Sequence, residues 1–327
     1  MNIGLLGFGV VGRGVYDMLA GRDDIRAAWV LCRRDLGELT ARTTYEMQDI
    51  LDDPAVDTVV EVMGGLHPAY EYVAAALRAG KNVVSSNKYL MCRYYDELTA
   101  LANEHGAALR CTAAVGGGIP WLTNLEKAAH ANHISRVWGI LNGTTNYILT
   151  RMIRAGLSFD DALREAQANG YAEQDPTADI EGHDACRKIC ILASLAFGRH
   201  IYPRQVPTEG ITGVTLADVA YADSCGKKLK LLGRAIRRTD GKVCAYVAPH
   251  LVDRENPLSG VEDVFNAIAV RGNAIGDVMF YGRGACKLPP ASAVVADVID
   301  AAKHRDEKKR MFWAEGGDDT AVPPDGL

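Results

Sequence analysis

Residues 2–21 read NIGLLGFGVVGRGVYDMLAG, and this stretch decides the fold of the first part of the chain. Its start, residues 2–7, is a short apolar run typical of a buried strand, and its second half has a helical pattern. Between them, Gly7, Gly9 and Gly12 form a GxGxxG pattern. With 33 glycines among 327 residues, this triplet arises by chance about 0.3 times per chain, so the triplet alone is weak evidence for a dinucleotide site. Its position between a strand and a helix is the stronger evidence. Glycines there permit a tight turn and let a pyrophosphate approach the helix N-terminus, which predicts a dinucleotide site.

The alternation of apolar runs and helical patterns continues through the first 130 residues or so. Continuous rather than alternating apolar strands, separated by helices, indicate a parallel sheet that is covered on both faces. The predicted fold class is therefore α/β, with an N-terminal Rossmann-type, doubly wound parallel sheet. The expected strands are residues 2–7, 27–32, 57–63, 81–86 and 108–113.

The pattern changes after residue 133, where β-hairpin signals appear. Hairpins indicate antiparallel strands, so the second domain is predicted to be α+β. We expect a strand over 135–141, helices over 145–156, 159–170 and about 182–197, hairpins over 228–252 and 265–282, and a last helix over 291–304. The domains are then residues 1–132 and 133–286, and the end of the chain, 314–327, reads as a polar tail.

Length and composition narrow the function class. A chain of 327 residues suggests about two domains, and 48% hydrophobic with 24% charged residues is typical of a globular protein. Its net charge of −5 argues against a nucleic-acid partner, which needs a concentrated basic face. The sequence shows neither an apolar run of membrane-spanning length nor a basic leader, so we expect a cytoplasmic protein without membrane contact and with a small-molecule ligand.

The chain has eight cysteines, and none of them forms a CxxC pair. Several of these cysteines lie inside apolar runs, as in VLCRR and KICILA. We therefore expect reduced and buried thiols rather than disulfides or a metal site.

Two basic positions are candidates for contacts with a dinucleotide. Arg33 and Arg34 end the second predicted strand, where an NAD-binding fold places an acidic residue for the ribose. Two guanidinium groups suit a 2'-phosphate and favour NADP, although Asp35 keeps NAD open. Asn87 and Lys88 follow a later strand at the carboxyl edge of the sheet, where open α/β sheets bind ligands.

The segment GYAEQDPTADIEGHDACRK, residues 170–188, concentrates acidic residues ahead of an apolar helix. Asp184 and Lys188 stand four residues apart, the spacing of an ordinary exposed ion pair. Residues 185–197 are apolar almost all round, so we expect this helix to be buried and its charges to line a cavity. A desolvated lysine can exchange a proton at physiological pH, and Glu173 and Asp179 can recognise a cationic group. These residues predict a nicotinamide enzyme for a small, amine-bearing alcohol or aldehyde.

Over nearly its whole length the chain resembles homoserine dehydrogenase, in a short form that lacks the C-terminal ACT regulatory module. The resemblance implies NAD(P)-dependent interconversion of L-aspartate 4-semialdehyde and L-homoserine, on the route to threonine and methionine. It implies a homodimer made through the second, substrate-binding domain, and a C-terminal helix at about 287–313 that returns to the first domain. The segments that carry it are GFGVVGRG (7–14), VVEVMGG (59–65), SSNKYL (85–90), AAVGGGIP (113–120), GILNGTTNYIL (139–149), GYAEQDPTADIEGHDACRK (170–188) and GRGACKLPPASAVVAD (282–297).

The resemblance also implies roles for individual residues. Lys188 would donate and accept the proton on the substrate oxygen, Asp184 would contact the substrate, and Lys88 would lie beside the reacting group. The implied substrate set is Glu173, Asp179, Asp184, Tyr171, Gly143 and Thr144. The implied cofactor set is Gly7, Phe8, Gly9, Val10, Val11, Gly12, Arg33, Arg34, Asn87, Lys88, Gly170, Glu173 and Cys286.

The chain departs from the family pattern at two of these segments. Thr112 stands where the family commonly has a glutamate that helps to hold a sodium or potassium ion, which leaves the backbone carbonyls of Val115, Gly117 and Ile119. Cys286 replaces a glycine near the nicotinamide. Two alternatives therefore stay open: a dehydrogenase of another small amino alcohol or semialdehyde, and a catalytically silent NADP-binding sensor.

Overall fold

The structure is a computed structural model that describes residues 1–37, 39–284, 287–304 and 313–324. The chain forms two compact units. Unit 1 comprises Met1–Pro120 and Ala285–Met311, and unit 2 comprises Trp121–Gly284 and Phe312–Leu327.

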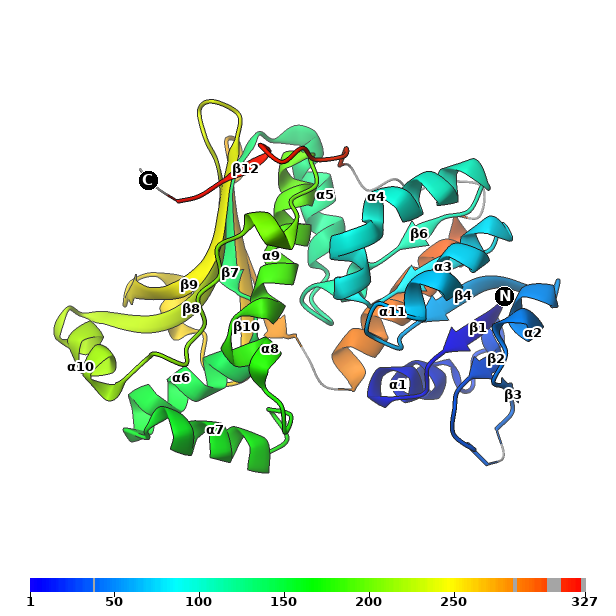
Figure 1. The fold of residues 1–327 in the computed structure, drawn as a ribbon, viewed down its shortest axis with the longest axis horizontal. Coiled ribbons are helices and arrows are strands. Elements are labelled where there is room, and N and C mark those ends of the chain that lie inside the picture. The colour runs from blue at the N-terminus through cyan, green and yellow to red at the C-terminus, as the bar shows by residue number, and fades with distance from the viewer. Residues whose placement is uncertain (38, 285–286, 305–312, 325–327) are drawn as a thin grey trace. The chain divides into compact units, whose positions relative to one another are not determined.

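Unit 1 contains a six-stranded sheet in which every neighbouring pair is parallel. Its strand order, β3-β2-β1-β4-β5-β6, is that of the Rossmann fold, so the predicted doubly wound sheet is confirmed (Figure 1). The three-residue strand β3 was missed because the sequence RTT has no apolar run. The strands are β1 (Asn2–Leu6), β2 (Arg26–Leu31), β3 (Arg42–Thr44), β4 (Val56–Glu61), β5 (Asn82–Ser85) and β6 (Leu109–Arg110).

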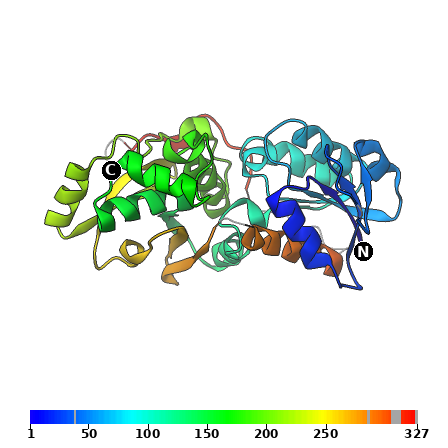
Figure 2. The same ribbon diagram turned by 90° about the horizontal axis from the view of Figure 1, so that it is seen from below.

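Helices cover both faces of this sheet. The helices α1 (Val10–Leu19) and α11 (Leu288–Lys303) lie side by side on one face, and α3 (Ala69–Arg78) and α4 (Lys88–Glu104) lie on the other (Figure 2). Gly14 permits the close approach of α1 and α11, because a Cβ there would lie 2.9 Å from Ala291 Cβ. The unit also contains α2 (Met47–Asp52) and the 3-10 turn η1 (Thr112–Ala114).

Unit 2 is built on a second six-stranded sheet with the order β11-β10-β7-β8-β9-β12. Its first five strands pair antiparallel, as the predicted hairpins require, and β12 joins β9 in parallel. The predicted α+β architecture of this part is confirmed. The strands are β7 (Ile134–Ile140), β8 (Lys227–Arg237), β9 (Val243–Asp253), β10 (Phe265–Gly272), β11 (Gly276–Arg283) and β12 (Ala321–Val322).

The helices α6 (Gly143–Ala155) and α9 (His183–Phe197) pack on one face of this sheet (Figure 1). Gly233 in β8 allows this contact, because a Cβ there would lie 3.2 Å from Ile189 Cβ. The buried helix expected at 182–197 is α9, and its last residues from Ile189 onward are all buried. The remaining elements are α5 (Trp121–Ala131), α7 (Phe159–Ala168), α8 (Thr177–Ile180), α10 (Leu216–Ser224), η2 (Pro203–Gln205) and η3 (Pro257–Gly260).

The division of the chain differs from the one expected at residue 132. Helix α5 belongs to unit 2, because it packs against α9 and β10 and because Trp121 contacts Phe280 at 5.0 Å between ring centroids. An amphipathic pattern does not reveal which of two cores a helix joins.

The C-terminal segment also differs from the expected polar tail. Ala314 pairs with both sides of residue 199, because its N–H donates to Gly198 O and its carbonyl accepts from His200 N. Further on, Val243 N donates to Thr320 O, and β12 adds to the sheet edge. This segment binds through its backbone and through side chains such as Asp318, which accepts from Arg204, and its polar composition does not reveal these contacts.

Most of the cysteines behave as expected. All seven cysteines that the structure describes are free thiols. Five are buried and Cys32 is half-buried, but Cys225 is exposed, so the prediction of burial is wrong for that residue. Cys286 lies outside the described residues.

Within the described ranges, every helix is too short or too polar to cross a membrane.

We expect one buried lysine to make the stability of unit 2 depend on pH. The side chain of Lys230 is fully buried, and its Nζ donates to Asn146 Oδ1 at 3.0 Å and to Val261 O at 2.5 Å. Burial lowers the pKa of Lys230 to about 8. Between this value and the pKa of about 10.4 in an unfolded chain, the unfolded state binds more protons, so the free energy of unfolding rises with pH.

We predict that Lys230→Met removes this rise. Relative to Lys230→Met, the free energy of unfolding of the unmodified protein should increase by about 3 kcal/mol between pH 7 and pH 10.5, since one pKa unit corresponds to about 1.4 kcal/mol. Urea unfolding across this pH range measures it. The exposed Lys242→Met serves as the matched control and should leave the pH dependence unchanged. Parallel pH curves for the unmodified protein and Lys230→Met would contradict the prediction.

Candidate active site

The glycine-rich turn joins β1 to α1 in unit 1. Gly7 has φ +97°, a conformation that other residues rarely adopt, and a Cβ on Gly12 would lie 2.2 Å from Gly7 O. Gly9 is the N-cap of α1 and supplies no side-chain cap, so no side chain covers the first N–H groups of α1 from that position. Among the described residues, a Cβ on Gly9 would meet no atom within 4 Å beyond its chain neighbours, so they leave the space beside it open. This turn fits the pyrophosphate of a dinucleotide.

A buried carboxylate organises the same edge of the sheet. Glu61 ends β4 and is fully buried, and it accepts hydrogen bonds from Met63 N at 2.8 Å and from Ser85 Oγ at 2.6 Å. Burial raises the pKa of Glu61, and the hydrogen bonds oppose this rise. Ser85 Oγ accepts from Asn87 N, and Asn87 Nδ2 donates to Gly65 O. The network therefore ties together the loops that follow β4 and β5.

Glu61 was missed as a site residue. Its signal in the sequence is a carboxylate inside the otherwise apolar run VVEVM. A buried charge of this kind needs partners, but the sequence does not identify them.

The predicted cofactor residues of unit 1 lie at this carboxyl edge or beside the glycine turn. Asn87 caps α4 by accepting from Leu90 N at 3.1 Å, and Lys88 is the first residue of that helix. Arg33 and Arg34 are exposed, and Arg34 donates to Phe8 O at 3.2 Å. Val10 and Val11 form the first turn of α1.

One more basic side chain, Arg13, and one acidic side chain, Asp35, belong to the predicted cofactor-binding region. Arg13 lies over the Phe8 ring at 5.1 Å. The carboxylate of Asp35 accepts from Gly37 N at 2.9 Å within its own turn.

The ion pair of unit 2 lies on α9. Lys188 Nζ is 2.7 Å from Asp184 Oδ2, and both residues are buried, at 8% and 5% exposure. This burial excludes the ordinary exposed ion pair that the spacing alone allows. Lys188 Nζ also donates to Leu141 O at 2.6 Å. An ammonium has three N–H bonds, so within the described part of the chain one of them remains available for a ligand oxygen.

Asn142 connects this pair to a second carboxylate. Its Nδ2 donates to Asp184 Oδ2 at 2.9 Å and to Asp179 Oδ1 at 2.7 Å. Burial raises the pKa of Asp179, and the charge of Asp184 adds to the rise. Three different segments, namely the turn after β7, α8 and α9, thus bring Asn142, Asp179, Asp184 and Lys188 together.

Sequence reasoning missed Asn142, although its segment carries part of the family resemblance. The available signal was an asparagine between a strand and a helix, at the N-cap position three residues before Thr145. That signal predicts a helix start, and only the fold shows that the same amide reaches two carboxylates.

The other predicted substrate residues lie around the loop after α7. Thr144 Oγ1 donates to Tyr171 O at 2.7 Å, and the Tyr171 ring packs on Tyr147. Glu173 is exposed, and its carbonyl accepts from Gln167. Gly143 opens α6, and Gly170 precedes the loop with φ +73°. The structure thus brings Thr144 and Tyr171 together, while the carboxylate of Glu173 lies at the surface.

The residues predicted to bind a monovalent cation lie at the end of Met1–Pro120, the first segment of unit 1. Val115, Gly117 and Ile119 are buried. Thr112 donates to Asp297 through both its N–H, at 2.8 Å, and its hydroxyl, at 2.7 Å. The residues that the structure describes contain no group of three or more histidine, cysteine, aspartate or glutamate side chains suited to a metal ion.

Comparisons with known proteins agree with these features. The chain matches the family model of homoserine dehydrogenase over residues 120–299, and the model of the homoserine dehydrogenase NAD-binding domain over residues 7–112. It is 40% identical to homoserine dehydrogenase of Bacillus subtilis over 318 residues, which cover 93% of this chain and 73% of that protein.

Solved structures show the same relationship. The crystal structure of a homoserine dehydrogenase from Thiobacillus denitrificans superposes with a TM-score of 0.93 at 38% identity, covering 100% of this chain and 80% of that one. A hyperthermophilic archaeal homoserine dehydrogenase in complex with NADPH superposes with a TM-score of 0.79 at 28% identity, covering 94% of this chain and 99% of that one. The Rossmann sheet, the glycine turn and these matches over nearly the full length lead to one conclusion: the chain belongs to the homoserine dehydrogenase family of NAD(P)-dependent oxidoreductases.

Proposed function

We propose that the chain interconverts L-homoserine and L-aspartate 4-semialdehyde with a nicotinamide cofactor, and that Lys188 exchanges the proton on the reacting oxygen. The observation that carries this proposal is the buried Lys188 ammonium, which contacts Asp184 and Leu141 O and keeps one N–H for a ligand. A pair of this kind in a water-poor site suits proton transfer to an alcohol or aldehyde oxygen.

The protein's part in the reaction follows from these contacts. When bound, the nicotinamide supplies or accepts the hydride. In the reducing direction negative charge develops on the substrate oxygen, and Lys188 stabilises it and donates a proton. In the oxidising direction Lys188 accepts the hydroxyl proton. Asp184 keeps the side chain of Lys188 oriented. Lys88, the first residue of α4, lies at the edge of the unit 1 sheet that would bind the cofactor.

Carboxylates suit the ammonium group of the amino-acid substrate. Glu173 offers an exposed carboxylate on the loop that Thr144 holds through Tyr171 O. Asp179 lies beside Asp184 through their shared amide partner. We assign the substrate ammonium to Glu173, with Asp179, Tyr171, Gly143 and Thr144 around it.

We predict that Lys188→Ala lowers kcat for L-homoserine oxidation by about 10²- to 10⁴-fold, the usual contribution of a general acid or base. NADPH binding, followed by its fluorescence, should be unchanged. Lys227→Ala, which removes an ion pair with Asp253 at the surface, is the control and should keep normal turnover. A Lys188→Ala enzyme with near-normal kcat would remove the assignment.

We propose NADP as the preferred cofactor and NAD as a weaker one. Arg34 lies against the backbone of the glycine turn at Phe8, and Arg33 is its exposed neighbour. Asp35, the residue that favours NAD, already accepts a hydrogen bond within its own turn.

We predict that Arg34→Ala raises KM for NADP by about 10-fold or more, because a hydrogen bond to a charged group contributes about 1.5–3 kcal/mol. KM for NAD, which lacks the 2'-phosphate, should change little. Steady-state kinetics with both cofactors measures the ratio, and Arg42→Ala, an exposed arginine over Trp29, is the control. An equal change for both cofactors would contradict NADP selection by this residue.

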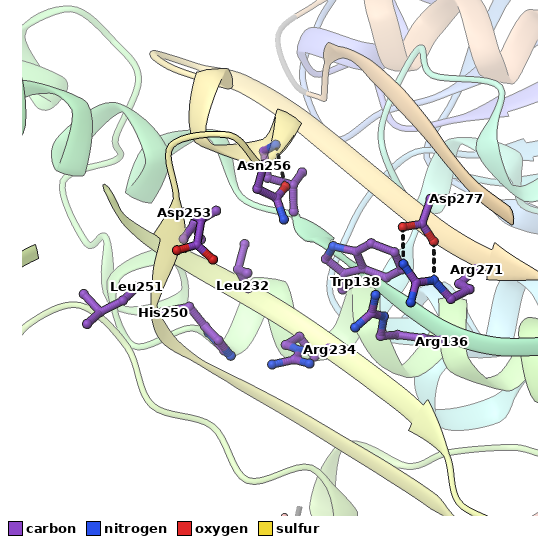
Figure 3. Close-up of a pocket in the computed structure, with 12 residues that line it drawn as sticks. Arg136, Trp138, Leu232, Arg234, His250, Leu251, Asp253, Asn256, Arg271 and Asp277 are labelled. Carbon is purple, nitrogen blue, oxygen red and sulfur yellow. Dashed lines mark hydrogen bonds and ion pairs between the residues drawn. The ribbon is translucent and has the colours of Figure 1, made fainter. Parts of the chain in front are cut away.

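We infer a homodimer that forms through unit 2. Strand residues alternate between faces, so Gly233 faces α9 while its neighbour Arg234 faces the opposite side of the sheet. That opposite face has a pocket in which Arg136, Trp138 and Arg234 lie close to one another (Figure 3). Arg136 stacks on Trp138 at 4.1 Å, over a cluster that includes Leu232 and Val252. The charged side chains that line this pocket, Arg234, Arg271 and Asp277 among them, lie beside these buried apolar residues and suit contact with a second copy.

We predict a particle of twice the 35.3 kDa chain mass in sedimentation velocity. Arg234→Glu, which reverses a charge on this face, should shift the distribution toward monomer. A monomeric unmodified protein at micromolar concentration would contradict the homodimer.

We also propose that a monovalent cation binds without a carboxylate from residue 112. The Thr112 side chain is an uncharged hydroxyl that donates to Asp297, so residue 112 adds no negative charge to a cation site. Sodium or potassium would depend on the backbone carbonyls of Val115, Gly117 and Ile119. Repeating the homoserine assay with tetramethylammonium in place of potassium separates a cation-dependent enzyme from an independent one.

A further inference from the structure

The side chain of Asn142 bridges the carboxylates of Asp179 and Asp184. The proposed mechanism gives this bridge no role. Its single NH₂ group donates to Asp179 Oδ1 at 2.7 Å and to Asp184 Oδ2 at 2.9 Å. Two ionised carboxylates near one another repel, and each N–H of the amide offsets part of this repulsion.

The fold fixes which way this amide points. Asn142 Oδ1 accepts from Thr145 N at 2.8 Å and from Thr145 Oγ1 at 3.0 Å, as the N-cap of α6. A backbone N–H can only donate, so the amide oxygen must face Thr145. The NH₂ group must then face the two carboxylates, because the opposite orientation places an oxygen against them.

The preceding residue acts on the same ion pair. Lys188 Nζ donates to Leu141 O at 2.6 Å, and Asp184 Oδ2 is contacted by both Lys188 and Asn142. The turn between β7 and α6 thus holds the ammonium through its backbone and the carboxylate through its side chain. The charged side chains at this turn are Asp179 on α8 and Asp184 and Lys188 on α9.

We propose that Asn142 is a positioning residue that keeps the Asp184 carboxylate aimed at Lys188, so that the ammonium presents its remaining N–H to the substrate oxygen. This inference rests on the proposed function of Lys188. Without the bridge, nothing from Asn142 offsets the repulsion between Asp179 and Asp184, so Asp184 takes up a proton more readily and is then a poorer partner for the ammonium.

Asn142→Ser tests the bridge, because serine keeps the helix cap and lacks the NH₂ group. We expect kcat to fall by about 10- to 100-fold, with KM for NADPH and the midpoint of thermal unfolding nearly unchanged. A kcat within twofold of normal would overturn the proposal. A loss of kcat together with a lowered unfolding midpoint and lost NADPH binding would also overturn it, because that pattern indicates a structural role.

Asn142→Asp tests the electrostatic part, because aspartate also caps a helix and adds a third carboxylate. A nearby like charge disfavours ionisation of Asp184, so the acid limb of the kcat profile should move to higher pH by about one unit. The matched control is Asn82→Asp at the amino end of β5, where the side chain accepts from Ala108 N. This control should show the normal profile, and an unshifted profile in Asn142→Asp would contradict the proposal.

A second readout does not depend on turnover. In protein labelled with ¹³C at aspartate carboxyls, the carboxyl that titrates last should do so at higher pH in Asn142→Ser than in the unmodified protein. Absence of this shift overturns the role of Asn142 whatever the substrate. If instead the unmodified protein shows no oxidation of L-homoserine, the proposed function fails, and the carboxyl titration still decides whether Asn142 controls the pair.

Discussion

The buried ion pair of Lys188 and Asp184 is the constraint on which the rest of unit 2 depends. Two charges removed from water destabilise a fold unless geometry and further hydrogen bonds compensate for the lost hydration. Here the compensation comes from the turn after β7, through Leu141 O and the amide of Asn142. The sheet must therefore hold this turn against α9, and Gly233 permits that contact.

Much of the fold follows from the sequence because its signals are local and strong. Continuous apolar strands predict the parallel sheet of unit 1, and the two hairpins predict the antiparallel part of unit 2. The elements that the sequence did not predict correctly have weak or misleading local signals. Strand β3 is three polar residues, β12 is only two residues long, and the amphipathic helix α5 gives no sign of which core it joins.

The candidate site divides in a similar way. The glycine turn and the charges of α9 are visible because their spacing and their apolar surroundings are sequence properties. Glu61 and Asn142 were missed because their importance lies in contacts between segments far apart in the chain. The exposure of Glu173 could not be predicted from the sequence either, because the apolar helix that follows does not indicate how the preceding loop is oriented.

The return of α11 to unit 1 has a consequence for synthesis on the ribosome. Ala291, Val294 and Val298 belong to the same apolar core as Ile3 and Leu5 of β1. The core that forms around the first strand therefore stays open while nearly all of unit 2 is being translated. Domains generally fold as units as they emerge, so residues 121–284 of unit 2 can pack before α11 completes the core of unit 1, and β12 joins the unit 2 sheet last.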